Sequence, residues 1–134
     1  MRAPMVLLAG LLVMQTAYAT EPSTPVVKVT MANDGKTVAL KTGQPMEVVL
    51  ESNRTTGFSW SVGKFDTAIL TLVGQAVYAV SEAKPGMTGV GGTETWHFVA
   101  AAPGEQPLKF VYRRPFEANA RPARTFTFTV RILP

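Results

Sequence analysis

The sequence predicts an all-β protein, an antiparallel β-sandwich of about seven to eight strands. Two observations lead to this fold class. Apolar and polar residues alternate with a period of two in successive runs, as half-buried antiparallel strands require. The runs are short, turns rich in Gly, Pro and Asn separate them, and no long segment has a helical period. A closed barrel built from the same strands stays open as an alternative, although the spacing of the turns favours a sandwich.

The first two runs predict a β-hairpin. Residues 27–31 and 37–40 both alternate, and residues 33–36 (Asn-Asp-Gly-Lys) lie between them. An Asp-Gly pair between two such runs is typical of a hairpin turn. Asp34 is expected to hydrogen bond locally to the backbone of that turn.

The later runs follow the same rule after a break at residues 42–45. An apolar stretch over residues 69–80 is interrupted at Gly74-Gln75, which indicates a bulge or a tight bend. Trp60 alternates inward and is expected to lie in the core. The apolar faces consist of Met46, Val48 and Leu50; Phe58, Trp60 and Val62; Trp96 and Phe98; Leu108, Phe110 and Tyr112; and Phe126, Phe128, Val130 and Ile132.

The first 19 residues have the features of a secretory signal peptide. Arg2 gives a positive start, Met5–Met14 is an uninterrupted apolar run, and Ala17 and Ala19 are small residues where a signal peptidase cleaves. The apolar run is roughly half of the ~20 residues that a membrane-spanning helix needs. We therefore expect a signal peptide at residues 1–19, a flexible leader at 20–25, a sandwich domain at 26–134, and export to the periplasm or the medium without a membrane anchor.

The composition argues against several classes of function. The chain has no cysteine, which excludes disulfides, a thiol nucleophile and a thiolate metal site. The net charge of +4 includes Arg2, so without residues 1–19 it falls to +3, too little for a nucleic-acid surface. The single histidine, His97, is placed mid-strand on a polar face, and the glutamates are scattered singly. Catalysis, a metal site and a cofactor are therefore not expected.

Three segments between the strands contain more chemistry than a simple turn requires. They are residues 53–60 (NRTTGFSW), 84–93 (KPGMTGVGGT) and 113–117 (RRPFE). In a sandwich, alternate connections leave from the same end, and function concentrates on such loops. These segments are therefore expected to form one composite surface.

In this order, the three segments resemble the loops of chagasin-type inhibitors of cysteine peptidases. That family has an Asn-Pro-Thr-Thr-Gly-aromatic-x-Trp loop, a Gly-x-Gly-Gly loop and an Arg-Pro-Trp loop on an immunoglobulin-like sandwich. The resemblance covers essentially the whole chain after residue 19. The residues that it assigns to peptidase binding are Asn53, Arg54, Thr55, Thr56, Gly57 and Phe58; Gly89, Val90, Gly91 and Gly92; and Arg114, Pro115 and Phe116.

The resemblance implies a reversible, non-covalent inhibitor of papain-type peptidases that acts as a monomer. The first loop would lie over the catalytic cysteine, and the other two loops would fill the cleft on either side. Thr55 and Thr56 offer short hydroxyl side chains, Gly57 allows a sharp turn, and the glycine-rich backbone fits a narrow channel. Phe116 provides an apolar anchor and Arg114 a planar donor.

Two residues depart from the family pattern. Arg54 stands in place of the proline, which removes a rigid φ angle from the first loop. Phe116 stands in place of the tryptophan, which keeps a large ring but removes the indole N–H donor. Both are expected to alter affinity or target preference. The alternative hypothesis is an immunoglobulin-like binding or adhesion module of the cell envelope that uses the same loops for another ligand.

Overall fold

The computed structural model describes residues 24–81, 91–117 and 119–134, and in these ranges the chain is mostly β-structure. No helix in them is long and apolar enough to cross a membrane. Three short 3₁₀ turns are present in these ranges, η1 (Met31–Asn33), η2 (Arg54–Thr56) and η3 (Pro115–Glu117). The strands are β1 (Val27–Val29), β2 (Thr37–Lys41), β3 (Pro45–Ser52), β4 (Ser59–Val62), β5 (Leu70–Leu72), β6 (Val77–Val80), β7 (Gly92–Ala100), β8 (Gly104–Arg113) and β9 (Arg124–Leu133).

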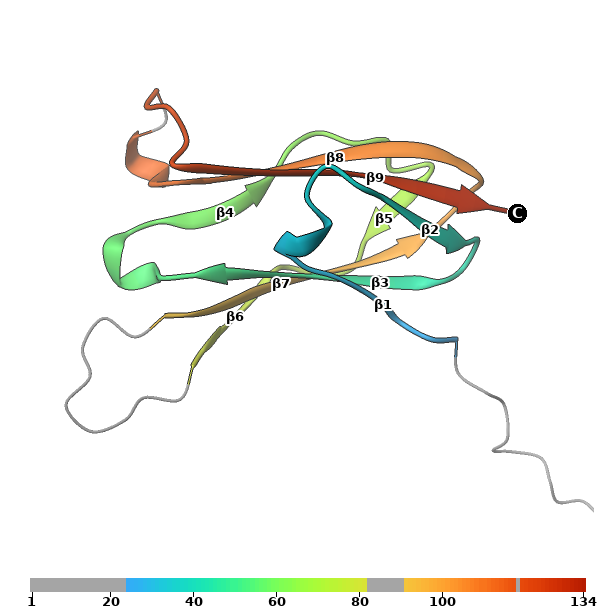
Figure 1. The fold of residues 1–134 in the computed structure, drawn as a ribbon, viewed down its shortest axis with the longest axis horizontal. Helices are drawn as coiled ribbons and strands as arrows, with labels where there is room; N and C mark the ends of the chain where they lie inside the picture. Colours follow the sequence, from blue (N-terminus) through green and yellow to red (C-terminus); the bar gives the residue numbers. More distant parts are fainter. Residues whose placement is uncertain (1–23, 82–90, 118) are drawn as a thin grey trace, which may run out of the picture.

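The strands form two sheets that stack face to face (Figure 1). One sheet has the order β1-β3-β7-β5, with β6 also paired to β7, and the other has the order β2-β9-β8-β4. The predicted β-sandwich is thus confirmed. The described ranges contain nine strands rather than seven or eight. Two edge pairs, β1 with β3 and β2 with β9, are parallel, which the alternation alone did not indicate.

The predicted hairpin at residues 33–36 is wrong. The strand before this turn belongs to one sheet and the strand after it to the other, so the chain crosses between the sheets here. Asp34 Oδ1 accepts a hydrogen bond from Thr127 N (2.9 Å), and Gly35 N donates to Thr127 O (2.7 Å). The Asp34 side chain therefore ties the crossover to β9, while its backbone N–H donates to Met31 O (3.1 Å) within the turn. Through this crossover the short strand β1 pairs with the long strand β3, and β2 pairs with the long strand β9, whereas a two-stranded hairpin would pair β1 only with β2.

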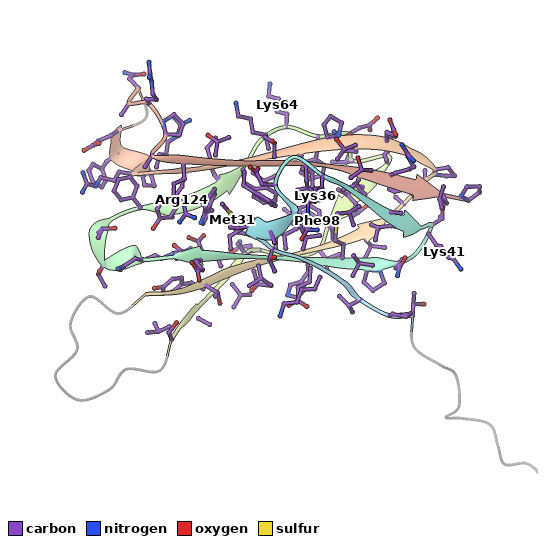
Figure 2. The ribbon with its side chains drawn as sticks, in the orientation of Figure 1. Met31, Lys36, Lys41, Lys64, Phe98 and Arg124 are labelled. Atoms are coloured by element: carbon purple, nitrogen blue, oxygen red, sulfur yellow. The ribbon has the colours of Figure 1, made fainter. Side chains whose placement is uncertain are left out.

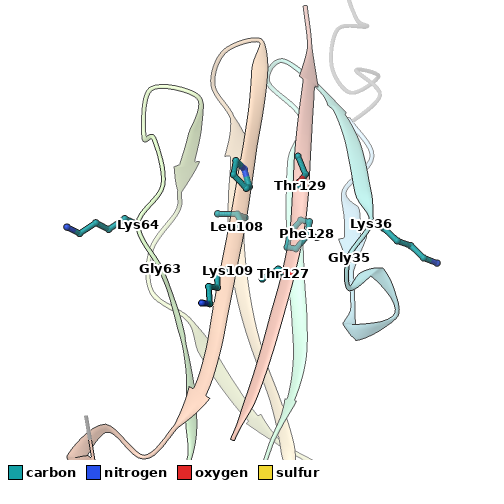
Figure 3. A pocket seen from close by; sticks show the side chains of 10 residues that line it. Gly35, Lys36, Gly63, Lys64, Leu108, Lys109, Thr127, Phe128 and Thr129 are labelled. Carbon is teal, nitrogen blue, oxygen red and sulfur yellow. The ribbon is translucent and has the colours of Figure 1, made fainter. Parts of the chain in front are cut away.

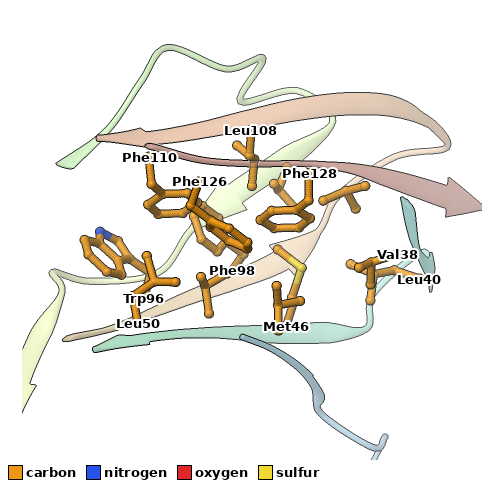
Figure 4. Close-up of a cluster of buried hydrophobic side chains, with 14 of the residues drawn as sticks. Val38, Leu40, Met46, Leu50, Trp96, Phe98, Leu108, Phe110, Phe126 and Phe128 are labelled. Atoms are coloured by element: carbon orange, nitrogen blue, oxygen red, sulfur yellow. The ribbon is translucent and has the colours of Figure 1, made fainter. Parts of the chain in front are cut away.

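The core lies between the sheets and consists largely of the predicted apolar faces (Figure 4). Phe98 and Phe110 are 0% exposed, and Trp60 is 4% exposed, which confirms its predicted place in the core. Phe58 and Val62 are only partly buried. Figure 2 shows Phe98 between the layers, with Lys41 and Lys64 directed away from them.

The connections that contain η2 and η3 emerge at the same end of the sandwich, where β6 ends and β7 begins (Figure 1). We call this the loop end: residues 53–58, residues 114–117 and Gly91. The predicted signal peptide and residues 20–23 of the predicted leader lie outside the described residues, as do Gly89 and Val90.

Candidate functional site

The first loop is a 3₁₀ turn closed by its own hydrogen bonds. Asn53 Oδ1 accepts from Thr55 N (3.1 Å) and from the Thr55 hydroxyl. Thr56 Oγ1 donates to Asn53 O (2.7 Å), and Gly57 N donates to Arg54 O (3.0 Å). Gly57 has a φ of +84°, a left-handed conformation that other residues adopt only with strain. Both threonine hydroxyls donate within the loop, so toward a partner these exposed side chains offer acceptors.

Aromatic rings support this loop from the interior. The Tyr112 hydroxyl accepts a hydrogen bond from Asn53 N (2.9 Å). The Tyr112 ring stacks on Phe58 with centroids 5.2 Å apart and lies 4.9 Å from Trp60. Trp60 Nε1 donates to Glu51 O (2.8 Å). Trp60 therefore belongs to the base of the loop, and Phe58 is half covered by its neighbours.

The third loop packs against the first. Arg114 Nε donates to Thr56 O (3.0 Å), and its guanidinium carbon lies 4.6 Å from the centroid of the Phe58 ring. The Phe116 ring lies beside Gly57, where an added Cβ would be 3.4 Å from Phe116 Cε1. Phe116 itself is 75% exposed. Two motifs that are far apart in the sequence thus form one continuous surface.

The glycine motif is described only in its second half. Gly91 is half-buried, and its carbonyl accepts a hydrogen bond from Ser81 N (2.9 Å). This bond joins the two sides of the β6–β7 connection just beyond the last paired residues. Gly91 precedes Gly92, which pairs with Ser52 at the end of β3, so Gly91 lies near the start of the first loop. The predicted placement of Gly89 and Val90 in a peptidase cleft stays a prediction.

Gly92 has a structural role in the described residues. It is buried at the start of β7, where it pairs with Ser52 on one side and Val80 on the other. A Cβ at this position would overlap the carbonyl group of Ala79. The absence of a side chain at Gly92 thus allows β6 to approach β7 closely.

A hollow of about 310 Å³ lies between the first loop and the glycine motif. Arg124 borders it, with its guanidinium carbon 5.6 Å from the ring centroid of Trp60 and 5.8 Å from that of Tyr112. The lining residues are Glu51, Ser52, Asn53, Ser81, Gly91, Gly92, Tyr112 and Arg124. A partner bound to the loop end would meet this hollow directly.

The sequence analysis did not identify Glu94, whose buried carboxylate connects the first loop to β3 and β4. Its oxygens accept hydrogen bonds from Ser52 Oγ (2.5 Å), Trp60 N (3.1 Å) and Arg54 Nη2 (3.2 Å). A signal was present, because Glu94 falls in step with the inward-facing residues Trp96 and Phe98 of the same strand. A glutamate in that register must be buried and therefore paired.

Another hollow, of about 510 Å³, lies away from the loop end, on the outer face of the sheet that contains β8 and β9 (Figure 3). Lys36 and Lys64 border it, but their side chains point away from each other in Figure 3, so they do not converge on a ligand. Among the described residues, no group of three His, Cys, Asp or Glu side chains is placed to hold a metal ion.

Comparison with known families decides the identity of the chain. The model described as "Chagasin family peptidase inhibitor I42" matches residues 39–130. The chain belongs to the chagasin family. Both loops whose geometry is described above fall within the matched residues. Membership confirms the resemblance predicted from the three loop sequences, and it confirms that the chain is an inhibitor rather than an enzyme.

Two characterised members of the chagasin family are similar over most of their length. Amoebiasin-1 of Entamoeba histolytica is 32% identical over 106 residues, which is 79% of this chain and 99% of that protein. Chagasin of Trypanosoma cruzi is 30% identical over 104 residues, which is 75% of this chain and 92% of that protein.

Solved structures of family members have the same fold. The solution structure of Amebosin, at 32% identity, superposes with a TM-score of 0.65 and covers 81% of this chain and 99% of that chain. The cysteine protease inhibitor EhICP2 of Entamoeba histolytica, at 23% identity, superposes with a TM-score of 0.74 over 84% of this chain and 100% of that chain. The latter comparison supports the fold alone.

Proposed function

We propose that the chain is a reversible, non-covalent inhibitor of papain-type cysteine peptidases and that its loop end blocks the active-site cleft. Membership of the chagasin family of peptidase inhibitors supports this target class. Among proteins of similar fold, EhICP2 is a cysteine protease inhibitor and PbICP-C has been solved in complex with falcipain-2. The partner proposed for this chain is therefore a papain-family peptidase.

The single observation that carries the proposal is that the first and third loops pack together into one surface. Gly57 lies against Phe116, and Arg114 holds the carbonyl of Thr56. The exposed Phe116 ring and the exposed Thr55 and Thr56 side chains thus face outward from one preformed surface. A large apolar anchor beside short polar groups suits a substrate cleft, in which an apolar subsite neighbours a polar catalytic centre.

The hydrogen bonds of the first loop explain how such a surface would resist cleavage. A scissile carbonyl must enter the oxyanion hole of the peptidase as the thiolate attacks its carbon. The carbonyls of Asn53, Arg54 and Thr56 already accept hydrogen bonds from within the protein. These bonds hold residues 53–57 in a compact 3₁₀ turn and would have to break before the backbone could extend like a substrate, so the loop would occupy the cleft without becoming a substrate.

Preorganisation would make the association strong for its size. Binding usually costs free energy when loops become ordered, and that cost falls when the bound shape already exists in the free protein. Here the sandwich and the rings of Trp60 and Tyr112 fix the position of the first loop. No covalent bond to the peptidase is required.

We also propose that the chain is exported and acts as a monomer in the periplasm or the medium. The pattern of residues 1–19 supports export, and β1 begins at Val27, so cleavage after Ala19 would leave every described strand intact. The test is the N-terminal sequence and the native mass of the protein recovered from the cell envelope and the medium. A start at Thr20 and a monomeric mass support the proposal, and retention of residues 1–19 contradicts it.

An inhibition titration tests the proposed function. Residues 20–134 are titrated into papain and into a cathepsin-L-like peptidase, with trypsin as the control. We expect stoichiometric inhibition of both cysteine peptidases, recovery of activity on dilution, recovery of the intact chain, and no effect on trypsin. Absence of inhibition at micromolar protein, with the sandwich shown to be folded, contradicts the proposal.

A further inference from the structure

The carboxylate of Glu94 is buried at the base of the loop end. Its side chain is 0% exposed and accepts hydrogen bonds from Ser52 Oγ and Trp60 N. A charge in these surroundings needs an opposite charge nearby, because burial removes the water that would solvate it. Arg54 Nη2 lies 3.2 Å from Glu94 Oε1 and supplies that charge. Glu94 thus holds the side chain of a loop residue against a strand.

The side chain of Arg54 also contacts β6, the strand paired with β7. Tyr78 on β6 and Glu94 on β7 are direct partners across the β6–β7 ladder. The guanidinium carbon of Arg54 lies 4.7 Å from the centroid of the Tyr78 ring, within the range of a cation–π interaction. One side chain therefore ties the first loop to both strands that flank the glycine motif in the sequence.

Arg54 occupies the position at which the family pattern has proline, and it is the first residue of the η2 turn. Proline at the first position of a helical turn fixes the φ angle in a suitable range. Arginine leaves φ free, but contacts at two points with the body of the protein restrict the same residue from outside.

We propose that the contacts of Arg54 with Glu94 and Tyr78 preorganise the first loop for binding and couple it to β6 and β7. This inference rests on the proposed inhibitory function. Arg54 is then a positioning residue, because its effect on binding passes through the conformation of residues 55–57. The replacement that preserves this function is proline, although lysine is chemically closer to arginine.

The test compares three variants in the free protein and in the inhibition assay. Arg54→Ala removes the contacts, and Arg54→Pro removes them but restores a rigid φ angle. Arg131→Ala is the control for loss of an arginine ion pair away from the loop end, since Arg131 pairs at 3.0 Å with Glu105 between β8 and β9, where both partners are exposed. Amide hydrogen exchange is measured in the free protein, because the three amides of residues 55–57 all donate hydrogen bonds within the loop.

We expect Arg54→Ala to accelerate exchange at residues 55–57 and to weaken inhibition of papain, each by about tenfold. Arg54→Pro leaves Glu94 without its partner as Arg54→Ala does, but it fixes φ, so it should exchange more slowly and inhibit more strongly than Arg54→Ala, by about threefold or more. Arg131→Ala should change neither. Exchange rates that stay the same in Arg54→Ala, or an Arg54→Pro variant as impaired as Arg54→Ala, overturn the inference.

A further variant addresses stability and the coupling to β6. Tyr78→Leu removes the cation–π contact while the Arg54–Glu94 pair remains, so it avoids an unpaired buried charge. Faster exchange at residues 55–57 in this variant supports coupling to β6, and an unchanged rate contradicts it. If the unchanged protein inhibits no papain-type peptidase, the proposed function fails, whereas the exchange rates of the free protein still decide whether Arg54 positions the loop.

Discussion

Gly57 and Phe116 belong to different loops, yet the Phe116 ring covers the position where a side chain of residue 57 would begin. The distance from an added Cβ to Phe116 Cε1 would be 3.4 Å. The glycine thus has two functions, since it permits a φ of +84° and leaves room for the ring beside it. The surface proposed to bind the peptidase depends on this contact between the two loops.

Replacement of Gly57 by alanine should therefore weaken inhibition, and this effect should exceed what its loss of folding stability explains. The left-handed conformation costs a non-glycine residue about 1–3 kcal/mol, and relaxation of that strain would displace the first loop from Phe116. Gly43→Ala is the matched control, because Gly43 has a φ of +89° and open space around its added Cβ. We expect both variants to lose similar stability in thermal unfolding. Only Gly57→Ala should weaken inhibition, by tenfold or more, and equal inhibition constants for the two variants would refute the role of this contact.

Phe116→Ala should weaken peptidase binding by about 2 kcal/mol, the effect typical of an apolar anchor at the centre of an interface. Its ring is 75% exposed, so its removal should leave the unfolding temperature nearly unchanged. Val26→Ala, at another exposed apolar residue, should affect neither property. Surface plasmon resonance against papain measures the difference, and an unchanged affinity for Phe116→Ala would remove this residue from the proposed site.

The two described glycines of the second motif should respond differently to alanine. At Gly92 the new Cβ would overlap the carbonyl of Ala79, so we expect β6 to separate from β7 and stability to fall by about 1–3 kcal/mol. At Gly91 the nearest atom, Ser52 O, would be 3.5 Å away, an ordinary contact. Denaturant unfolding should therefore distinguish the two variants. A stable Gly92→Ala variant would show that the close approach of the strands does not require glycine.

Asp34→Ala should reduce stability without affecting inhibition. The carboxylate accepts a hydrogen bond from Thr127 N and thereby ties the crossover between the sheets to β9. Its loss is expected to cost about 1–2 kcal/mol in denaturant unfolding. The inhibition constant should stay the same at a temperature at which both proteins are folded. A loss of inhibition in the folded variant would mean that the surface bound by the peptidase extends beyond the loop end.

Much of the sandwich could be predicted because its long strands have one apolar face. The alternation in β9 places Phe126, Phe128, Val130 and Ile132 in the core, where the structure has them. The partner of each short strand could not be predicted in the same way. The Asp-Gly turn indicated a hairpin, but nothing local in the sequence shows that Asp34 bonds to a residue on β9.

The candidate site was predictable as three motifs but not as a network. The sequence motif placed Arg54 in the first loop, where its replacement of proline was expected to make the loop less rigid. Its contacts with Glu94 and Tyr78 depend on the pairing of β6 with β7, which joins residues that are distant in the sequence. Gly92 was assigned to the peptidase-binding surface for its lack of a side chain. In the structure, the same lack of a side chain lets the Ala79 carbonyl of β6 lie against Gly92.

The central claim is that one end of the sandwich binds the peptidase cleft. Hydrogen exchange of residues 20–134, free and in complex with papain, tests this most directly. The account predicts slower exchange in the complex at residues 53–58 and 114–117, and unchanged exchange at residues 41–44, next to the other end of β3. Slower exchange on an outer face of either sheet, with the loop end unchanged, would contradict it.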